Sequence, residues 1–369
     1  CDLCYWRNYC NEIWKKEDHL CQTAFINKNQ IKKLNSFKIN TMKELSEFDR
    51  KNKIPELNQT SLLRLQQQAS LQVRSRETGR NYFELIKKDE VFLNTKGLHV
   101  NGRFGLQLLP KPSIGDLFFD MESDPFSYEK LEYLFGIFYF IDGNEIFKSF
   151  WALSHDEERN TFKNFMGFLK KHLREFPLAH IYHYAPYEKE ALRRLSNKYD
   201  IEKEFIDNLL RKEKLVDLYK IVRESIRISE PKYSIKNLEK FYSDKFGDRT
   251  GSVISAADSV IYFEDWKNSG ESKNSKILDE IENYNLQDVR STYFLRQWLL
   301  EIMLENKIEH APILTKDEDK IELSDKAKLY AIELGILKNK LESEIDTEQS
   351  SNNQELDYKR ILIDLLDFH

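Results

Sequence analysis

At residues 117–122 the chain contains the stretch Leu117-Phe118-Phe119-Asp120-Met121-Glu122. A short run of large apolar residues of this kind predicts a buried strand. Successive side chains of a strand point to opposite faces, so Asp120 and Glu122 share one face at its end. Two neighbouring carboxylates in an apolar setting repel each other, which indicates a shared proton or a bound cation. Oxygen ligands favour a hard ion, Mg²⁺ or Mn²⁺. The alternative is that the strand ends here and both acids face water.

The composition is that of a globular protein with room for more than one domain. The chain has 369 residues, of which 40% are hydrophobic and 32% charged. Its formal net charge of −5 is unlike that of many nucleic-acid binders, although a metal-dependent nuclease concentrates acids at its site. No apolar run reaches the ~18 residues of a membrane span and no signal peptide is recognisable, so we expect a cytoplasmic protein with no membrane partner. The chain begins with Cys1 and ends with His369 directly after an apolar run, so we expect a fragment of a longer polypeptide.

Residues 115–303 predict one α/β domain. Hairpin residues Asp142-Gly143 join two of its strands. A long amphipathic helix around Phe162–Leu173 and a helix over Tyr187–Tyr199 follow. The expected strands are 117–122, Tyr133–Ile141, Glu145–Leu153, Leu178–Tyr184 and Leu215–Tyr219. The order β-β-β-α-β-α-β, with acids on the first strand, is that of the ribonuclease-H-like fold, a mixed five-stranded sheet flanked by helices.

Two further stretches supply acids to this domain. Glu188 follows the fourth strand at the start of a helix, where the helix N-terminus favours a carboxylate; a plain dipole effect is the alternative. Tyr284 and Asp288 are four residues apart on a predicted helix and therefore share a face. Alone, a tyrosine and an aspartate at this spacing indicate little; together with the first strand, the three stretches are far more specific.

Asp120-Met121-Glu122, the run His183–Glu188 and Tyr284-x3-Asp288 resemble the three motifs of the DEDD, DnaQ-like 3′→5′ exonucleases, in their tyrosine variety. The departure is Glu188, where that family usually has Asp. The resemblance implies that Asp120, Glu122, Glu188 and Asp288 bind two Mg²⁺ or Mn²⁺ ions and that Tyr284 orients the attacking water. It also implies a single-stranded 3′ end as substrate, DNA rather than RNA. We expect His183 and Tyr184 to stack on terminal bases, because stacking tolerates any sequence. The alternative is that they are core residues of the strand-to-helix turn.

All four cysteines lie in the first 21 residues: Cys1, Cys4, Cys10 and Cys21. The triplet Cys1-x2-Cys4-x5-Cys10 resembles that of predicted RecB-type nucleases, a family to which most of residues 1–302 is similar. The resemblance implies that residues 1–25 end an upstream PD-(D/E)xK nuclease domain. It also implies a 4Fe–4S cluster completed by a cysteine outside this fragment, and a helicase in the same polypeptide. A local site with Cys21, a zinc site with His19, or free cysteines are the alternatives.

Residues 26–110 predict a helical region and linker. One helix is expected at Lys28–Leu34 and a second begins at the capping box Thr41–Glu44. The pair looks like a helix-hairpin-helix, in which three lysines would bind phosphate. The alternative is an ordinary helical pair, because the hairpin glycine is absent. Those lysines are Lys32, Lys33 and Lys38. Next come a helix over Ser61–Gln72 and a basic connector over Arg74–Arg80.

Residues 304–369 predict a helical and partly flexible extension. One helix is expected at Ser324–Leu341, followed by an acidic flexible stretch.

The sequence is compatible with two functions of the whole chain. The first is a metal-dependent exonuclease, and the second is a catalytically idle module that binds nucleic acid and links a RecB-type nuclease to a helicase.

Overall fold

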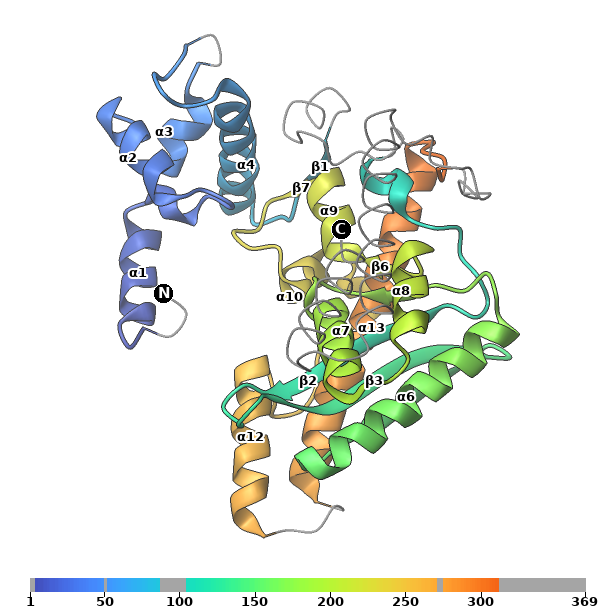
Figure 1. The fold of residues 1–369 in the computed structure, drawn as a ribbon. Coiled ribbons are helices and arrows are strands. Elements are labelled where there is room, and N and C mark those ends of the chain that lie inside the picture. The colour runs from blue at the N-terminus through green and yellow to red at the C-terminus, as the bar shows by residue number, and fades with distance from the viewer. Residues whose placement is uncertain (1–3, 50–51, 87–103, 271–274, 312–369) are drawn as a thin grey trace, which may run out of the picture. The chain divides into compact units, whose positions relative to one another are not determined.

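The structure is a computed structural model, and it describes residues 4–49, 52–86, 104–270 and 275–311 (Figure 1). A five-stranded mixed sheet has the strand order β4-β3-β2-β5-β6. Its strands are β2 (Leu117–Asp124), β3 (Leu131–Ile141), β4 (Asn144–Trp151), β5 (Ile181–His183) and β6 (Leu215–Asp217). Strand β3 is antiparallel to β2 and β4, whereas β5 is parallel to β2 and β6. The predicted sheet and its strand sequence are therefore confirmed.

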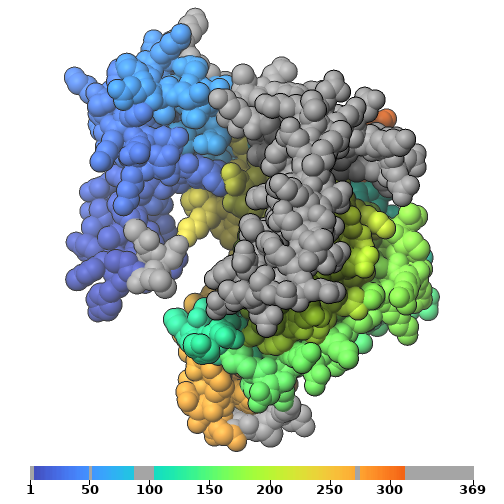
Figure 2. All heavy atoms as spheres, in the orientation of Figure 1, coloured from blue at the N-terminus to red at the C-terminus, as the bar shows by residue number. Residues whose placement is uncertain are grey.

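Helices cover both faces of this sheet. The helices after β4 are α6 (His155–Glu175), α7 (Tyr187–Tyr199), α8 (Lys203–Arg211), α9 (Leu218–Ser225), α10 (Ile235–Leu238), α11 (Ser243–Phe246), α12 (Ala256–Ser269) and α13 (Lys276–Glu305). On the face shown in Figure 2, α6 in green and α12 in orange form part of the molecular surface. No helix among the described residues combines the length and the apolar character that a membrane span requires.

Strand β2 separates two hydrophobic cores because its side chains alternate between the faces. Leu117, Phe119 and Met121 pack with residues of α6, α7 and α8. Phe118 points to the other face, where its ring lies 5.1 Å from that of Tyr293 on α13. Asp120 and Glu122 share the face of Phe118, so the alternation itself directs both carboxylates toward α13.

The N-terminal region is helical and has a core of its own. Its helices are α1 (Arg7–Lys16), α2 (Lys28–Ser36), α3 (Met42–Glu47) and α4 (Gln59–Thr78). The predicted capping box is present, because the side chain of Thr41 accepts from the backbone of Glu44 and the Glu44 side chain accepts from the backbone of Thr41.

The prediction of a non-helical basic connector over Arg74–Arg80 is wrong. Helix α4 continues to Thr78, since the first helix-ending residue is Gly79, which has a φ of 69°.

A two-stranded antiparallel sheet joins this region to the five-stranded domain. It consists of β1 (Phe83–Leu85) and β7 (Ile226–Ile228). The buried Gln68 of α4 reinforces the junction: its Nε2 donates to the carbonyl oxygen of Ile228 at 2.7 Å, and its Oε1 accepts from the hydroxyl of Tyr233 at 3.0 Å. The sequence did not predict this pairing, because three-residue strands are too short to show a period.

Two strands, β5 and β6, are shorter than predicted by two residues or more. Strand β6 ends at Asp217, whose carboxylate accepts from the backbone N–H groups of Tyr219 and Lys220 and so begins helix α9. Strand β5 covers Ile181–His183 of the longer predicted stretch. The helix and the acidic stretch expected beyond Ser324 lie outside the described residues.

Candidate active site

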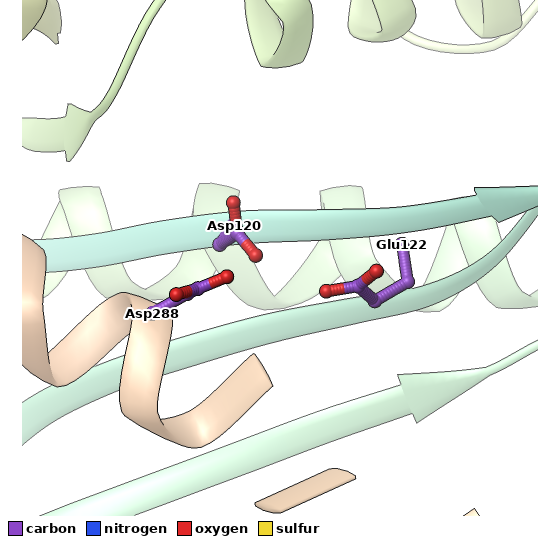
Figure 3. A group of neighbouring side chains, drawn as sticks. All are labelled: Asp120, Glu122 and Asp288. Atoms are coloured by element: carbon purple, nitrogen blue, oxygen red, sulfur yellow. The ribbon is translucent and has the colours of Figure 1, made fainter. Parts of the chain in front are cut away.

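Three of the predicted acids meet on the α13 face of the sheet. Asp120 and Glu122 project from β2 toward Asp288 on α13 (Figure 3). One carboxylate oxygen from each residue lies within 4.8 Å of the others. The residues come from segments more than a hundred positions apart, and the strand alternation and the α13 face bring them together. A group of three carboxylates at this spacing can hold a divalent cation.

The fourth acid, Glu188, lies beside this group and is not a member of it. It is in the first turn of α7 and is 3% exposed. It interacts with Asp120, because a hydrogen bond and the charge of Glu188 both help to raise the pKa of the Asp120 carboxyl. On its other side, Oε2 of Glu188 lies 3.3 Å from Nδ1 of His183. The side chain of Glu188 is therefore held between His183 and Asp120.

The two β2 carboxyls titrate far from their ordinary range. Burial, and then the charge of Asp288, raises the pKa of Glu122 to about 8, and hydrogen bonds to Ser259 and Asn285 oppose this rise in part. Burial, followed by the charges of Asp288, Glu122 and Glu188, raises the pKa of Asp120 well above its usual value. Without a cation, the protein thus favours protonated acids at neutral pH.

Asn285 and Gly136 complete the site, and the sequence analysis did not identify them. Asn285 Nδ2 donates to Oδ2 of Asp120 at 2.8 Å. Gly136 lies opposite Asp120 in the β2–β3 register. A Cβ at Gly136 would lie 1.6 Å from Asn285 Oδ1, so only glycine lets the asparagine approach the strand. Asn285 follows Tyr284 directly, and its position between Tyr284 and Asp288 is the sequence signal that could have identified it.

Tyr284 is buried beside Asp288 and is contacted by a lysine. Lys236 Nζ lies 3.0 Å from the Tyr284 hydroxyl. Burial, and then the charges of Asp288, Glu122 and Asp120, raises the pKa of Tyr284 above its ordinary value. Tyr284 consequently keeps its proton and can donate a hydrogen bond, but it does not serve as a base.

An arginine pairs with the third acid. Arg249 Nη2 lies 2.6 Å from Asp288 Oδ1, and Arg249 Nε donates to Oε2 of Glu239 at 2.9 Å. Nothing in the local sequence around Arg249 indicates this role, since residues 247–251 form a loop that reaches the site only in the fold.

The oxygen atoms at this site fit a hard divalent ion. Asn285 Oδ1 is buried and accepts no hydrogen bond from the described part of the chain, whereas Glu188 Oε2 and Asp288 Oδ1 are buried with one ion-pair partner each, His183 and Arg249. Buried oxygens without hydrogen-bond partners are costly, and a cation that prefers oxygen ligands would satisfy them. The residues present therefore fit the Mg²⁺ or Mn²⁺ that the sequence predicts.

His183 and Tyr184 are the residues expected to stack on bases, and His183 takes the alternative, a core position at the strand-to-helix turn. This residue is 1% exposed, and its Nδ1 contacts the carbonyl oxygen of Ala185 at 2.7 Å, so neither ring face is free for a base. The hydroxyl of Tyr184, which is half-buried, donates to the carbonyl oxygen of Tyr233. Its stacking role stays a prediction.

The three helix-hairpin-helix lysines are not equivalent. Lys33 Nζ donates to the carbonyl oxygen of Glu56 at 2.5 Å, whereas Lys32 and Lys38 are exposed. Lys38 has a φ of 60° in the connection between α2 and α3, the conformation that a hairpin glycine would adopt. Phosphate binding by these lysines stays a prediction.

The cysteines form no metal site among the described residues. Cys4 is exposed, Cys10 and Cys21 are half-buried, and none belongs to a group of three metal-ligating side chains there. His19 Nδ1 instead accepts from the backbone N–H of Cys21. Since Cys1 lies outside the described residues, the 4Fe–4S cluster, the upstream nuclease and the helicase remain predictions of the resemblance.

Residues 117–300 match the family model described as the RNase_H superfamily. Proteins of this superfamily generally hydrolyse phosphodiester bonds and usually use divalent metals. The matched residues contain the five-stranded sheet, the three clustered acids and Glu188. Searches of curated proteins and of solved structures found no match.

Proposed function

We propose that the ribonuclease-H-like domain at residues 117–300 is a metal-dependent phosphodiesterase that acts as a 3′→5′ exonuclease on single-stranded DNA ends. The observation that carries the proposal is the convergence of Asp120, Glu122 and Asp288 within 4.8 Å, with Glu188 beside Asp120. A structural role alone does not explain such a cluster, because desolvated like charges oppose folding. A divalent cation held by these carboxylates would supply the compensating charge.

The four acids would hold two divalent ions. Asp120 is close to Glu122 and Asp288 and also forms a hydrogen bond with Glu188. Ions bound there would lower the pKa of a water molecule and stabilise the leaving 3′-oxygen. Asn285 keeps the Asp120 carboxylate in place through its hydrogen bond to Oδ2. His183 does the same for Glu188 from the opposite side. The protein thus holds its ligands in position before substrate arrives.

Tyr284 would position the attacking water. Its raised pKa keeps the hydroxyl protonated, so the tyrosine donates a hydrogen bond and leaves proton removal to another group. Lys236 restrains the hydroxyl oxygen from the side. Tyr284 is accordingly a positioning residue, and its removal should reduce the rate less than removal of Asp120.

The test is hydrolysis of a 3′-labelled single-stranded oligonucleotide in Mn²⁺ by the wild type and by Asp120→Asn. We expect the substitution to lower the rate by at least about 100-fold, because it removes a ligand charge while keeping the side-chain volume. Asp207→Asn, on the exposed surface of α8, is the matched control and should hydrolyse like the wild type. Equal rates for Asp120→Asn and the wild type would reject the proposal.

A second function is favoured by one specific observation, the ion pair between Arg249 and Asp288. An arginine on a ligand carboxylate, together with Glu188 in place of the usual aspartate, suits an idle module that only binds nucleic acid. Calorimetric titration with Mn²⁺ separates the two functions. Binding of two ions that is lost in Asp288→Asn supports catalysis, whereas the absence of binding to the wild type supports the idle module.

A further inference from the structure

A second candidate site is a basic pocket of about 480 Å³ between α4, α9 and β7. This volume is in the range of roughly 300–1,000 Å³ typical of ligand sites. Four basic and two acidic side chains line it. The basic residues are Arg64, Lys220, Arg223 and Arg227. The two acids are Asp217 and Glu224, so the basic side chains outnumber the acidic ones.

One guanidinium nitrogen in this pocket has no hydrogen-bond partner among the described residues. Arg64 Nε is buried and has no hydrogen-bond partner in the part of the chain that the structure describes. Arg64, Arg223 and Arg227 line the same pocket. Burial, and then the charges of Arg223 and Arg227, lowers the pKa of Arg64. Asp217 is already engaged, since its Oδ1 accepts from the backbone N–H groups of Ala185 and Tyr219. Such a set of arginines matches an anionic group such as phosphate.

Aromatic rings lie beside the arginines. The guanidinium of Arg223 lies 5.1 Å from the ring centre of Phe25 and 5.5 Å from that of Tyr219. Phe25 is 40% exposed and has a φ of 63°, a conformation that is unfavourable for a bulky residue. Strain of this kind persists where the surroundings require it and often accompanies a binding role. Phosphate-binding arginines next to exposed rings are the arrangement that proteins use for single strands.

The pocket is continuous with the turn that carries Glu188. Pro186, which precedes α7, lines the pocket, and Glu188 lies two residues further along the chain. Tyr184, in the same turn, has its ring 5.6 Å from that of Tyr219 in the pocket wall. The start of α7 therefore supplies Pro186 to the pocket and Glu188 to the acidic group.

We propose that this pocket binds a phosphate and an adjacent base of the single-stranded substrate, a short distance along the strand from the acidic group. The inference rests on the proposed function for the identity of the ligand, because it takes the strand to be the substrate. Arg64 and Arg223 contact the phosphate, and Phe25 supplies a face for the base. The site is a binding site, and none of its residues touches the reacting atoms.

The test is binding of a fluorescent single-stranded DNA in EDTA, where no hydrolysis occurs, measured by anisotropy over a series of salt concentrations. The double variant Arg64→Gln/Arg223→Gln should bind at least about tenfold more weakly. Its slope of log affinity against log salt should be shallower by about 0.7, because the variant loses its contact with one phosphate of the single strand. The control Arg174→Gln/Arg211→Gln removes the same charge from exposed positions on α6 and α8 and should bind like the wild type.

A second variant guards against misfolding of the first. Phe25→Asn tolerates a positive φ, which offsets part of the packing that the ring loses against Tyr233, so the variant should still fold. It should weaken DNA binding about tenfold, or about 1.4 kcal/mol, within the loss of ~1–3 kcal/mol expected for one stacked base. Equal affinity and equal salt slope for the pocket variants and the control double variant would overturn the proposal.

Competition with inorganic phosphate distinguishes a DNA phosphate from free phosphate as the ligand. Displacement of the DNA by inorganic phosphate at an equal phosphate concentration would also overturn it, because the pocket would then be a site for free phosphate.

Failure of this site and failure of the proposed function can be distinguished. Asp120→Asn should retain full DNA binding in EDTA, since it leaves the pocket intact. With Mn²⁺, the pocket variants should raise KM for the oligonucleotide and leave hydrolysis of a small phosphodiester, bis(p-nitrophenyl) phosphate, unchanged. Equal hydrolysis of DNA by the wild type and Asp120→Asn would reject only the nuclease, whereas unchanged KM in the pocket variants would reject only the pocket.

Discussion

Single carboxyl groups with shifted pKa values predict how the stability of this domain depends on pH. Burial and the charge of Asp288 raise the pKa of Glu122 to about 8. The folded state therefore holds a proton that the unfolded chain releases near the ordinary value of 4.5. Between these two pH values the folded protein binds more protons than the unfolded protein, so its stability falls as the pH rises. A bound cation would replace the proton and remove this dependence.

We expect the free energy of unfolding in EDTA to decrease from pH 5 to pH 8, by up to about 1.4 kcal/mol per pH unit for each such group. Glu122→Gln should flatten this profile and should also weaken the gain in stability on adding Mn²⁺. Urea denaturation at four pH values measures both effects. The control Glu204→Gln, at an exposed position on α8, should leave the profile unchanged. An equally steep profile for Glu122→Gln would contradict the assignment of its raised pKa.

At the scale of elements, the site depends on how closely α13 packs on β3. Gly136 provides the space that Asn285 occupies, and Asn285 in turn holds Asp120. Gly136 has no functional group, but the space that it leaves lets α13 bring Asp288 close to the two acids of β2. A change in this packing should affect stability and activity together.

Gly136→Ala should therefore lower the free energy of unfolding by about 1–3 kcal/mol, because the added Cβ overlaps Asn285 and α13 must move. Oligonucleotide hydrolysis should fall as well. Gly167→Ala is the matched control: Gly167 lies in the exposed part of α6 with nothing within 4 Å of a new Cβ, and alanine there should stabilise the helix by about 0.5–1 kcal/mol. If the two substitutions had the same effect, the packing argument would fail.

At the scale of the described part of the molecule, the N-terminal helices are joined to the ribonuclease-H-like domain by specific polar contacts. Gln68 is 2% exposed and bonds to Ile228 and Tyr233 across the junction. The backbone N–H of Ala24 donates to Gln72, a further residue of α4. These bonds place Arg64 and Phe25 in the wall of the proposed DNA pocket.

Gln68→Ala should lower the free energy of unfolding by about 1–3 kcal/mol, since it leaves the carbonyl oxygen of Ile228 and the hydroxyl of Tyr233 without this partner. It should also weaken DNA binding in EDTA, because the pocket walls lose a shared contact. Thermal unfolding and anisotropy measure the two effects. Ser61→Ala, in the first turn of the same helix, should change neither, and unchanged DNA binding in Gln68→Ala would show that the junction does not shape the pocket.

The sequence alone determined the sheet, most helices and the acids of the site. Long apolar strands, the Asp142-Gly143 turn and the spacing of Tyr284 and Asp288 are local patterns, and local patterns follow directly from backbone geometry. Only the tertiary structure decided which residues complete the site. Gly136, Asn285 and Arg249 act through contacts between segments distant in the chain, and a side chain's partner across the fold has no period or motif that reveals it. The same reason explains the burial of His183 and the short pairing of β1 with β7, the strand whose residues Ile226 and Arg227 line the pocket: both depend on what the rest of the chain packs against them.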